Sequence, residues 1–414
     1  MPTIAPIAHV GRIAPALPPN GTARMPLNSL ELFAGAGGMA LGVARAGFTH
    51  LAVVERDKAA CTNLRENSKL LDPTAVAWPV VESDIQLFDY KPYARRVALL
   101  AGGPPCQPFS QAGKRRGHRD NRDMFPEAIR AVREVRPKAF IFENVRGILR
   151  PSFANYLEYL RLQLTHADVI RRPNERWGAH SARLEKWYTR GSVETYRVLL
   201  KWIDAADFGI PQRRQRVIIV GVRRDLAVEW SFPEPTHSED ALLYSKWVTK
   251  EYWDRHRIPK GKREQASARL RSRLERLRSE GVMKGILPWQ TVRDAIIGLP
   301  NPVQENDVPN HVHVPGARKY PGHTGSHFDW PAKALKAGNH GVPGGENMLR
   351  LPNGKVRYFT LRECGRLQTF PDKYVFTGTW SAVIRQLGNA VPVELSHRLA
   401  ESLKPVVLAE PTPG

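Results

Sequence analysis

The chain has little cysteine: Cys61, Cys106 and Cys364 are the only three among its 414 residues. They are odd in number and far apart, and no CxxC pair occurs, so the sequence supports neither a disulfide framework nor a zinc-type metal site. No apolar run approaches the roughly 18 residues that a membrane-spanning helix needs. These absences exclude a disulfide-stapled secreted domain and an integral membrane protein, and they suit the reducing cytoplasm.

Acidic side chains are scarce relative to basic ones. Asp and Glu number 40 against 62 Lys and Arg, so the formal net charge is +22. Net charge says little about the fold, but an excess of this size favours an anionic partner, and nucleic acid comes first. An ordinary basic soluble protein is the alternative that charge leaves open.

Composition divides the chain into five stretches. Residues 1–27 are rich in Pro and Ala without an apolar core, so we interpret them as a flexible leader rather than a signal peptide. Short apolar runs alternate with helical stretches over 28–224, whereas Pro, Gly, His and aromatic residues are scattered through 225–355. The helical pattern resumes over 356–404, and we expect a flexible tail at 405–414.

Six short runs are apolar almost throughout, as expected of strands that are buried on both faces of a sheet. They lie at 29–33, 51–55, 97–103, 139–144, 196–202 and 216–222. Their alternation with helical stretches requires crossover connections, so the sequence predicts an α/β fold with a mostly parallel sheet. Such sheets bind ligands beyond the carboxyl ends of their strands.

The stretch LELFAGAGGMALGVARAGF, residues 30–48, is typical of a strand, a glycine turn and a helix. Its turn glycines, which let a backbone approach a ligand closely, are Gly35, Gly37 and Gly38. Glu55 ends the next strand, where a carboxylate can accept hydrogen bonds from ribose hydroxyls, and Asp84 ends a third. The spacing is not GxGxxG and no GK[ST] follows, which argues against a dinucleotide site and a P-loop. Strand–helix packing without a ligand is the alternative.

Cys106 follows GGPP at the end of the run 97–103. Pro104 and Pro105 set the direction of the backbone there. A loop rich in Lys and Arg comes next, and its charge lowers a thiol pKa from about 8.5 towards neutrality. A buried structural cysteine is the alternative, but this setting favours a reactive thiolate with a mobile basic lid.

Two further strand ends carry charged side chains. Glu143 lies at the end of the run 139–144, where a carboxyl should have a raised pKa and exchange a proton near pH 7. In PQRRQR, Arg214 and Arg216 lie two residues apart on one face at the start of a strand, and they need an anion or polar acceptor there. A thiolate, a protonatable carboxyl, an arginine and a nucleotide-type site suit attack on C6 of cytosine, protonation at N3 and methyl capture at C5.

The motifs FAGAGG, GPPCQPFS, ENV, PQRRQR, RECGRLQTFPD and GNAVP follow one another along the chain. In this order they resemble the bacterial DNA cytosine-5 methyltransferases, over roughly 29–224 and 356–404. The resemblance implies a Rossmann-like core that uses S-adenosylmethionine, with a smaller irregular target-recognition domain at 225–355. It further implies double-stranded DNA as partner and a modification methylase paired with a restriction endonuclease in the bacterial cytoplasm. Base flipping needs only one chain, so we expect a monomer.

The resemblance also implies catalytic roles for four residues. Cys106 is the implied nucleophile on C6, and Glu143 is the implied contact to N3. Arg216 is expected to hold the cytosine O2, and Arg214 to support the flipped nucleotide.

For the cofactor, the resemblance implies stacking of Phe33 on the adenine, a ribose contact from Glu55, and adenine-edge contacts from Asp84 and Ile85. Asn389 is expected to close the pocket near Pro104. The full implied set is Phe33, Gly35, Gly37, Gly38, Glu55, Arg56, Asp84, Ile85, Pro104, Asn389 and Ala390. The stretch DNRDMF is one residue tighter than the family pattern, so Met124 is a weaker candidate.

Three stretches leave alternatives open. Residues 167–195 are either an insertion packed on the core or an extra DNA contact. The segment 263–281 is expected to be a helix with Arg269, Arg273 and Arg276 along one side, which either face solvent or contact phosphates. In the proposed recognition domain the candidate base-reading residues are Arg318, Lys319 and His323. By contrast, TLRE at 360–363 is a capping box that should start a helix, and 393–404 should form the last one.

Three other functions compete. A methyltransferase that acts on small molecules or protein is opposed by the charge of +22 and by the thiol, which simple methyl transfer to N or O does not need. An RNA cytosine-5 methyltransferase on the same core would have little or no recognition domain, whereas 225–355 is long. A catalytically silent DNA-binding regulator would lack Cys106, Glu143 or the glycine turn, and all of these are present.

We predict that Cys106→Ser keeps DNA binding and loses methyl transfer, because a hydroxyl is a far weaker nucleophile than a thiolate near neutral pH. Gel-shift titration and incorporation of a labelled methyl group measure the two properties separately. Turnover at the parent rate in this variant would refute the role of the thiol.

Overall fold

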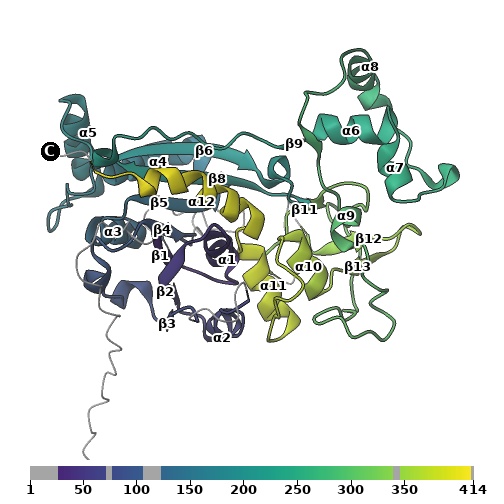
Figure 1. The fold of residues 1–414 in the computed structure, drawn as a ribbon, viewed down its shortest axis with the longest axis horizontal. Helices are drawn as coiled ribbons and strands as arrows, with labels where there is room; N and C mark the ends of the chain where they lie inside the picture. The colour runs from purple at the N-terminus through teal and green to yellow at the C-terminus, as the bar shows by residue number, and fades with distance from the viewer. Residues whose placement is uncertain (1–26, 71–76, 106–122, 339–345, 412–414) are drawn as a thin grey trace, which may run out of the picture.

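The computed structural model describes residues 27–70, 77–105, 123–338 and 346–411. A seven-stranded sheet forms the centre of the larger part of the molecule, in the order β3-β2-β1-β4-β5-β8-β6 (Figure 1). In that order the strands are Val80–Glu82, Thr49–Glu55, Asn28–Leu32, Leu99–Gly102, Ala139–Val145, Gln215–Arg223 and Tyr196–Asp204. Strand β8 runs antiparallel to both neighbours, and the first five strands are parallel. All six apolar runs form strands, and the predicted α/β fold with a mostly parallel sheet is confirmed.

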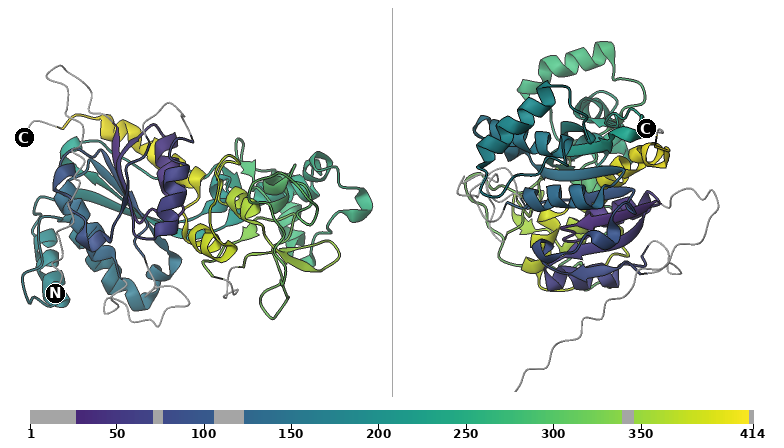
Figure 2. Two further views of the ribbon diagram at one scale, coloured as in Figure 1. Left: turned by 90° about the horizontal axis from the view of Figure 1, so that it is seen from below. Right: turned by 90° about the vertical axis from the view of Figure 1, so that its left-hand side faces the viewer.

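Helices cover both faces of this sheet (Figure 2). One layer consists of α3 (Phe125–Val135) and α4 (Ala154–Thr165), which share an apolar core with Leu30 and Leu32 of β1. The opposite layer consists of α1 (Gly38–Arg45) and α12 (Val393–Leu408). Because α12 comes from the far end of the chain, the fold of the sheet domain needs the C-terminal segment. Helix α2 (Lys58–Glu66) follows β2 beside the edge strand.

The last helix is longer than expected. It continues to Leu408, so the expected flexible tail at 405–414 is wrong in its first four residues. Val406 and Val407 are buried in the core between the sheet and α12. The ammonium group of Lys138 donates to the carbonyls of Val407 and Ala409, each at 2.9 Å, and so holds the end of the helix.

A smaller lobe lies beside the sheet domain and contains helices α6 to α9 (Figure 1). These helices span Glu239–Trp247, Glu251–Arg255, Arg271–Glu280 and Val292–Ile296. Two small apolar clusters hold α6, α7 and α8 together, one around Trp253 and one in which Leu274 and Leu277 of α8 pack on Leu243 of α6. Val292 of α9 instead packs with residues of α10.

The helix expected at 263–281 forms only from Arg271, after a 3-10 turn at Ala268–Leu270. The segment before it is drawn inward, because the Glu264 carboxylate accepts hydrogen bonds from Lys246 and from the indole of Trp330. On α8, Arg273 and Arg276 form ion pairs with acidic residues of α6. Their charge is therefore partly compensated, which favours a solvent-facing helix over a phosphate-binding one.

The chain then returns to the sheet domain through a hairpin and two helices. The hairpin pairs β12 (Met348–Arg350) with β13 (Val356–Tyr358), and the helices are α10 (Leu361–Leu367) and α11 (Trp380–Asn389). The predicted capping box is confirmed, because Thr360 and Glu363 each accept a hydrogen bond from the backbone N–H of the other. The lobe is also joined to the core where β7 (Gln212–Arg213) pairs with β11 (Ala332–Lys333). Within the lobe, β9 (His237–Ser238) pairs with β10 (Leu287–Pro288).

The stretch 167–195 contains helix α5 (Trp177–Thr189), which packs on α4. His180 is 1% exposed, and its ring hydrogen-bonds the Tyr159 hydroxyl at 2.8 Å. Helix α5 lies at the end of the molecule opposite the smaller lobe (Figure 1). This placement favours an insertion packed on the core over an additional DNA contact.

Within the described ranges, none of the helices combines the length and the apolarity that crossing a bilayer requires. The same residues contain no group of three or more His, Cys, Asp or Glu side chains arranged to hold a metal ion.

We predict that Gly38→Ala lowers the free energy of unfolding by about 2 kcal/mol, because a Cβ there would lie 2.1 Å from the Val391 carbonyl oxygen. Denaturant unfolding of the folded chain measures the change. Gly178→Ala is the matched control, since its Cβ would meet nothing within 4 Å. Equal stabilities of the two variants would contradict the close packing at Gly38.

Candidate active site

The candidate site lies at the carboxyl ends of neighbouring strands, where a parallel sheet brings side chains from different segments together. Strands β1 and β2 end at the glycine turn and Glu55, β4 leads to Pro104, and β5 ends near Glu143. Cys106 and the basic loop that follows it lie outside the described residues. The structure therefore gives the position of the backbone that precedes Cys106, but it does not give the position of the thiol.

The three glycines of the turn meet different constraints. Gly35 and Gly37 have φ of 54° and 79°, in the left-handed region that favours glycine. A Cβ on Gly37 would clash with Leu64, whereas one on Gly35 would meet nothing within 4 Å. Only Gly35 therefore borders open space that a ligand can enter, and the turn keeps Gly37 and Gly38 for internal packing.

Glu55 holds this turn in place. One oxygen of its carboxylate accepts the N–H of Gly35 at 2.8 Å, and the other accepts the N–H groups of Arg56 and Asp57, also at 2.8 Å. A carboxylate has about four acceptor positions, so one remains for a ribose hydroxyl. The sequence predicted the ribose contact but not this structural role.

Asp84 and Ile85 begin a 3-10 turn after β3. The Asp84 carboxylate accepts the N–H of Gln86 at 3.0 Å, and its other oxygen lies 3.8 Å from a guanidinium nitrogen of Arg56. Ile85 is buried, and Phe33 packs against the same apolar cluster with its ring half-buried. Met124 is half-buried beside this cluster as well.

At the other end of the site, Glu143 and Arg216 form an ion pair. Their Oε1 and Nε atoms are 2.5 Å apart, and only 9% and 13% of the two side chains is exposed. Beside them, the Asn144 amide donates to the Pro104 carbonyl at 3.3 Å. The structure thus brings the predicted carboxyl and one predicted arginine together, next to the backbone that precedes Cys106.

Arg214 has different partners from Arg216, although both were expected to face one acceptor. It precedes β8 and is fully buried, and its guanidinium donates to the carbonyls of Leu335 at 3.3 Å and Gly388 at 2.9 Å. Burial, with a smaller effect of the Arg216 charge, lowers the pKa of Arg214. Arg214 therefore joins three segments of the chain rather than presenting its charge at the surface.

Asp204 and Gln212 support this arrangement and were missed by the sequence analysis. The Asp204 carboxylate accepts the backbone N–H of Arg214 at 3.0 Å and the Arg213 side chain at 3.3 Å. The Gln212 side chain accepts the N–H of Leu335 at 2.9 Å. An aspartate at the end of a strand and before a turn that ends in glycine was the signal available for Asp204.

The GNAVP segment lies against the glycine turn, as expected, through the close approach of the Val391 carbonyl to Gly38. Ala390 is buried at the start of this contact. Asn389 ends α11 with an exposed side chain, which forms no hydrogen bond with the rest of the described chain. The expected closure of the pocket by Asn389 near Pro104 stays a prediction.

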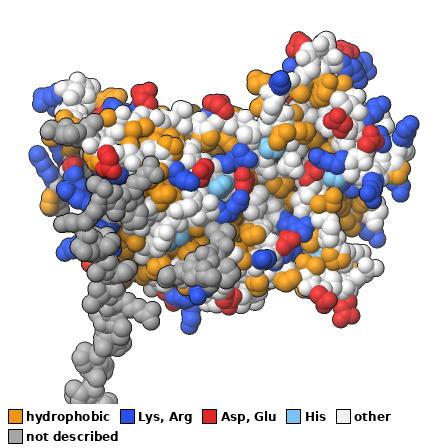
Figure 3. Space-filling view, viewed as in Figure 1, with side chains coloured by type: hydrophobic (Ala, Val, Ile, Leu, Met, Phe, Trp, Pro, Cys, Tyr) orange, Lys and Arg blue, Asp and Glu red, His pale blue; other side chains and the backbone are white. Residues whose placement is uncertain are grey.

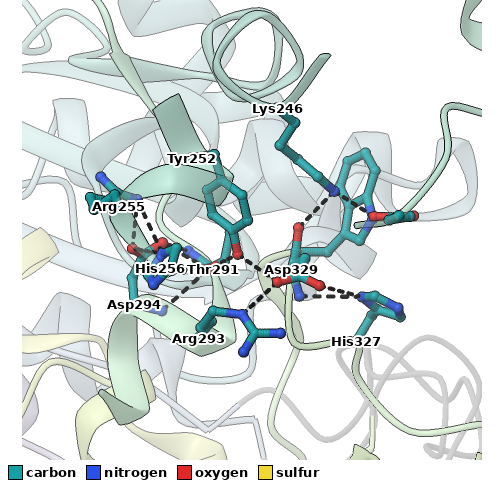
Figure 4. Close-up of polar contacts among 11 residues, drawn as sticks. Lys246, Tyr252, Arg255, His256, Thr291, Arg293, Asp294, His327 and Asp329 are labelled. Carbon is teal, nitrogen blue, oxygen red and sulfur yellow. Dashed lines mark hydrogen bonds and ion pairs between the residues drawn. The ribbon is translucent and has the colours of Figure 1, made fainter. Parts of the chain in front are cut away.

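In the smaller lobe, a network of buried polar groups fixes the segment that leads back to the site (Figure 4). Asp329 is its centre: its carboxylate accepts from Tyr252 at 2.9 Å and Arg293 at 2.6 Å, and its carbonyl accepts from the buried Lys246 at 3.0 Å. Asp294 binds His256 and Arg255 in the same network. The lobe can therefore hold strand β11 rigidly beside β7.

The suggested base-reading residues differ in exposure. Arg318 and Lys319 are exposed, whereas His323 is buried with its ring against Tyr320 and 3.8 Å from Glu346. His323 is therefore not free to reach a base edge. Basic side chains lie on the surface of both the sheet domain and the lobe, where acidic ones separate them (Figure 3).

The chain shares sequence and fold with DNA methylases. The family described as C-5 cytosine-specific DNA methylase matches residues 27–168 and 179–405, with a gap inside the insertion. Identity is 32% with the type II methyltransferase M.NgoMIV of Neisseria gonorrhoeae, over 92% of this chain and 97% of that protein. It is 33% with M.Eco47II of Escherichia coli, over 90% and 78%. The crystal structure of the Dnmt2 methyltransferase of S. pombe has a similar fold, with a TM-score of 0.52, 18% identity, and coverage of 92% of this chain and 99% of that one.

We predict that Arg214→Lys lowers the free energy of unfolding by roughly 2–4 kcal/mol, because a lysine cannot reach both carbonyls with a fork of N–H groups. Denaturant unfolding measures the loss. The neighbouring Arg213→Lys is the matched control, because Arg213 is half exposed, and we expect a loss below about 1 kcal/mol there. Similar losses in the two variants would contradict the linking role of Arg214.

Proposed function

The chain belongs to the C-5 cytosine-specific DNA methylase family and is a DNA cytosine-5 methyltransferase; we propose that it methylates a flipped cytosine in a specific short duplex sequence, with Cys106 as nucleophile and S-adenosylmethionine as methyl donor. The observation that carries this proposal is the buried Glu143–Arg216 pair beside the backbone leading to Cys106.

The proposed reaction uses the paired carboxylate and guanidinium on one base. The Cys106 thiolate adds to C6, and the electron pair of the C5–C6 bond is drawn towards N3 and O2. Glu143 takes up a proton when the base binds and passes it to N3, and Arg216 stabilises the negative charge that develops at O2. The carbon C5 then becomes nucleophilic. Loss of the proton from C5 after methylation lets the C6–S bond break and restores the thiolate.

Burial of the site supports base flipping. Glu143 and Arg216 are almost inaccessible at the end of the sheet, so a base that stays stacked in a duplex cannot reach them. Unstacking the target nucleotide therefore costs a few kcal/mol. We propose that Arg214 does not contact the base itself. By fixing the turn before β8, it holds Arg216 in place beside Glu143.

The residues at the ends of β1, β2 and β3 fit S-adenosylmethionine. The open space at Gly35, the remaining acceptor position of Glu55 and the apolar surface of Phe33 and Ile85 suit a backbone approach, a ribose and an adenine. When bound, this cofactor supplies an electrophilic methyl group on a sulfonium. We propose that Asp84 and Arg56 border the adenine edge, and that Pro104, Asn389 and Ala390 complete the pocket wall, while Gly37 and Gly38 pack the turn behind Gly35.

We propose the same domain boundaries and roles that the sequence predicts. Residues 28–224 and 356–404 form the catalytic and cofactor-binding domain, and 225–355 read the target in double-stranded DNA. The leader at 1–27 lies almost wholly outside the described residues. The type II methyltransferases among the relatives support a modification methylase that works beside a restriction endonuclease, as a monomer on DNA in the bacterial cytoplasm.

Bisulfite sequencing of DNA from a host that expresses the chain tests this function. We expect protected cytosines within one short recurring sequence, since methylation at C5 blocks bisulfite deamination. The host that expresses Cys106→Ser is the control and should show none. The absence of protected cytosines in cells that contain folded parent protein would contradict DNA methylation.

A further inference from the structure

Lys336 lies on the segment that joins the smaller lobe to the candidate active site. Strand β11 pairs in parallel with β7, and the N–H of Ala332 donates to the Pro211 carbonyl at 2.9 Å. The chain then passes Leu335, whose carbonyl accepts from Arg214. The next residue is Lys336, which is thus held beside Arg214 and Arg216 of PQRRQR.

The backbone of Lys336 is fixed on two sides. Its N–H donates to the Asn347 side chain at 2.9 Å, and its carbonyl accepts from the same amide at 3.0 Å. Gly388 packs against it so closely that a Cβ there would lie 2.3 Å from the Lys336 carbonyl carbon. The position of this lysine is therefore set by the surrounding structure rather than by a flexible loop.

No acidic side chain in the described part of the chain forms an ion pair with the ammonium group of Lys336. This ammonium group is partly buried and, among the residues that the structure describes, takes part in no ion pair or hydrogen bond. Burial, and then the charges of Arg216 and Arg214, lower the pKa of Lys336 to about 8. The carboxylate of Glu143 is already paired with Arg216. Among the described residues three cations therefore meet one anion, and a negatively charged group of the substrate would compensate this excess.

From this cluster we infer that Lys336 is a DNA-contacting residue whose ammonium group binds a phosphodiester next to the flipped cytosine. The inference rests on the proposed function, which brings that cytosine to Glu143 and Arg216. A phosphate beside the target nucleotide supplies the missing anion, and the rigid backbone of Lys336 gives the contact a fixed place relative to the base.

The position in the sheet favours a DNA phosphate over the carboxylate of the cofactor. The residues proposed to hold the ribose and the adenine, namely Glu55, Asp84 and Ile85, lie at the ends of β2 and β3, on one side of β4. Glu143 on β5 and Arg216 on β8 lie on the other side, and Lys336 is held beside the turn that enters β8. Lys336 is thus grouped with the residues proposed to hold the base.

The test compares Lys336→Met, which keeps the length of the side chain, with Lys336→Arg, which keeps the charge. Lys404→Met on α12 is the matched control, because it removes one half-buried positive charge, paired with Glu401, far from the site. Duplex binding is titrated between about 50 and 200 mM salt, the KM for DNA and kcat are measured, and S-adenosylmethionine affinity is measured without DNA. Lys336→Gln is a second charge-removing variant, and circular dichroism checks the fold of each protein.

We expect Lys336→Met and Lys336→Gln to raise the KM for DNA about tenfold and to reduce the slope of log affinity against log salt by about 0.9. The affinity of these two variants for S-adenosylmethionine should stay close to that of the parent. Lys336→Arg and Lys404→Met should keep the parent's KM for DNA and its salt slope. An unchanged salt slope in Lys336→Met would overturn the inference, and so would a loss of cofactor affinity with unchanged DNA binding. A parent that binds DNA without methylating it would count against the proposed function, while the salt slopes would still decide the role of Lys336.

Discussion

A guanidinium group without access to water has to find acceptors inside the protein, because an unpaired buried charge is far more costly than a paired one. Arg214 meets this requirement with the carbonyls of Leu335 and Gly388, which lie 121 and 174 positions further along the chain. Three segments must therefore come together before this side chain is satisfied: the turn before β8, the segment after β11 and the end of α11. The candidate active site is assembled where they meet.

The same junction connects the two halves of the proposed reaction. On one side of Arg214, strand β8 places Arg216 beside Glu143. The segment after β11 places Lys336 near the same two arginines. On the other side, α11 leads into GNAVP, which packs against the glycine turn through Val391. A cofactor site and a base site built on different strands can thus keep a fixed distance from each other. The smaller lobe is attached to the same junction, because its buried network around Asp329 lies just before β11 in the chain (Figure 4).

The features that the sequence predicted correctly depend on local patterns. Apolar runs became strands, and Thr360 and Glu363 formed the expected capping box. The errors come from long-range contacts that no local pattern reveals. Glu264 is drawn to Lys246 and so delays the helix expected from 263, and Lys138 extends the last helix by binding its carbonyls. The partners of Arg214 are backbone carbonyls, which any residue type supplies, so its linking role leaves no signature in the sequence.

The central claim is that the Cys106 thiolate adds to C6 of a cytosine brought to Glu143 and Arg216. Incubation of the protein and S-adenosylmethionine with a duplex that carries 5-fluorocytosine at the methylated position tests it most directly. After methyl transfer, fluorine cannot leave C5 as a cation, so the C6–S bond persists and the complex can be digested and mapped by mass spectrometry. The account predicts one adduct, on the peptide that contains Cys106. An adduct on another residue, or methylation of ordinary duplex without any trapped adduct, would contradict it.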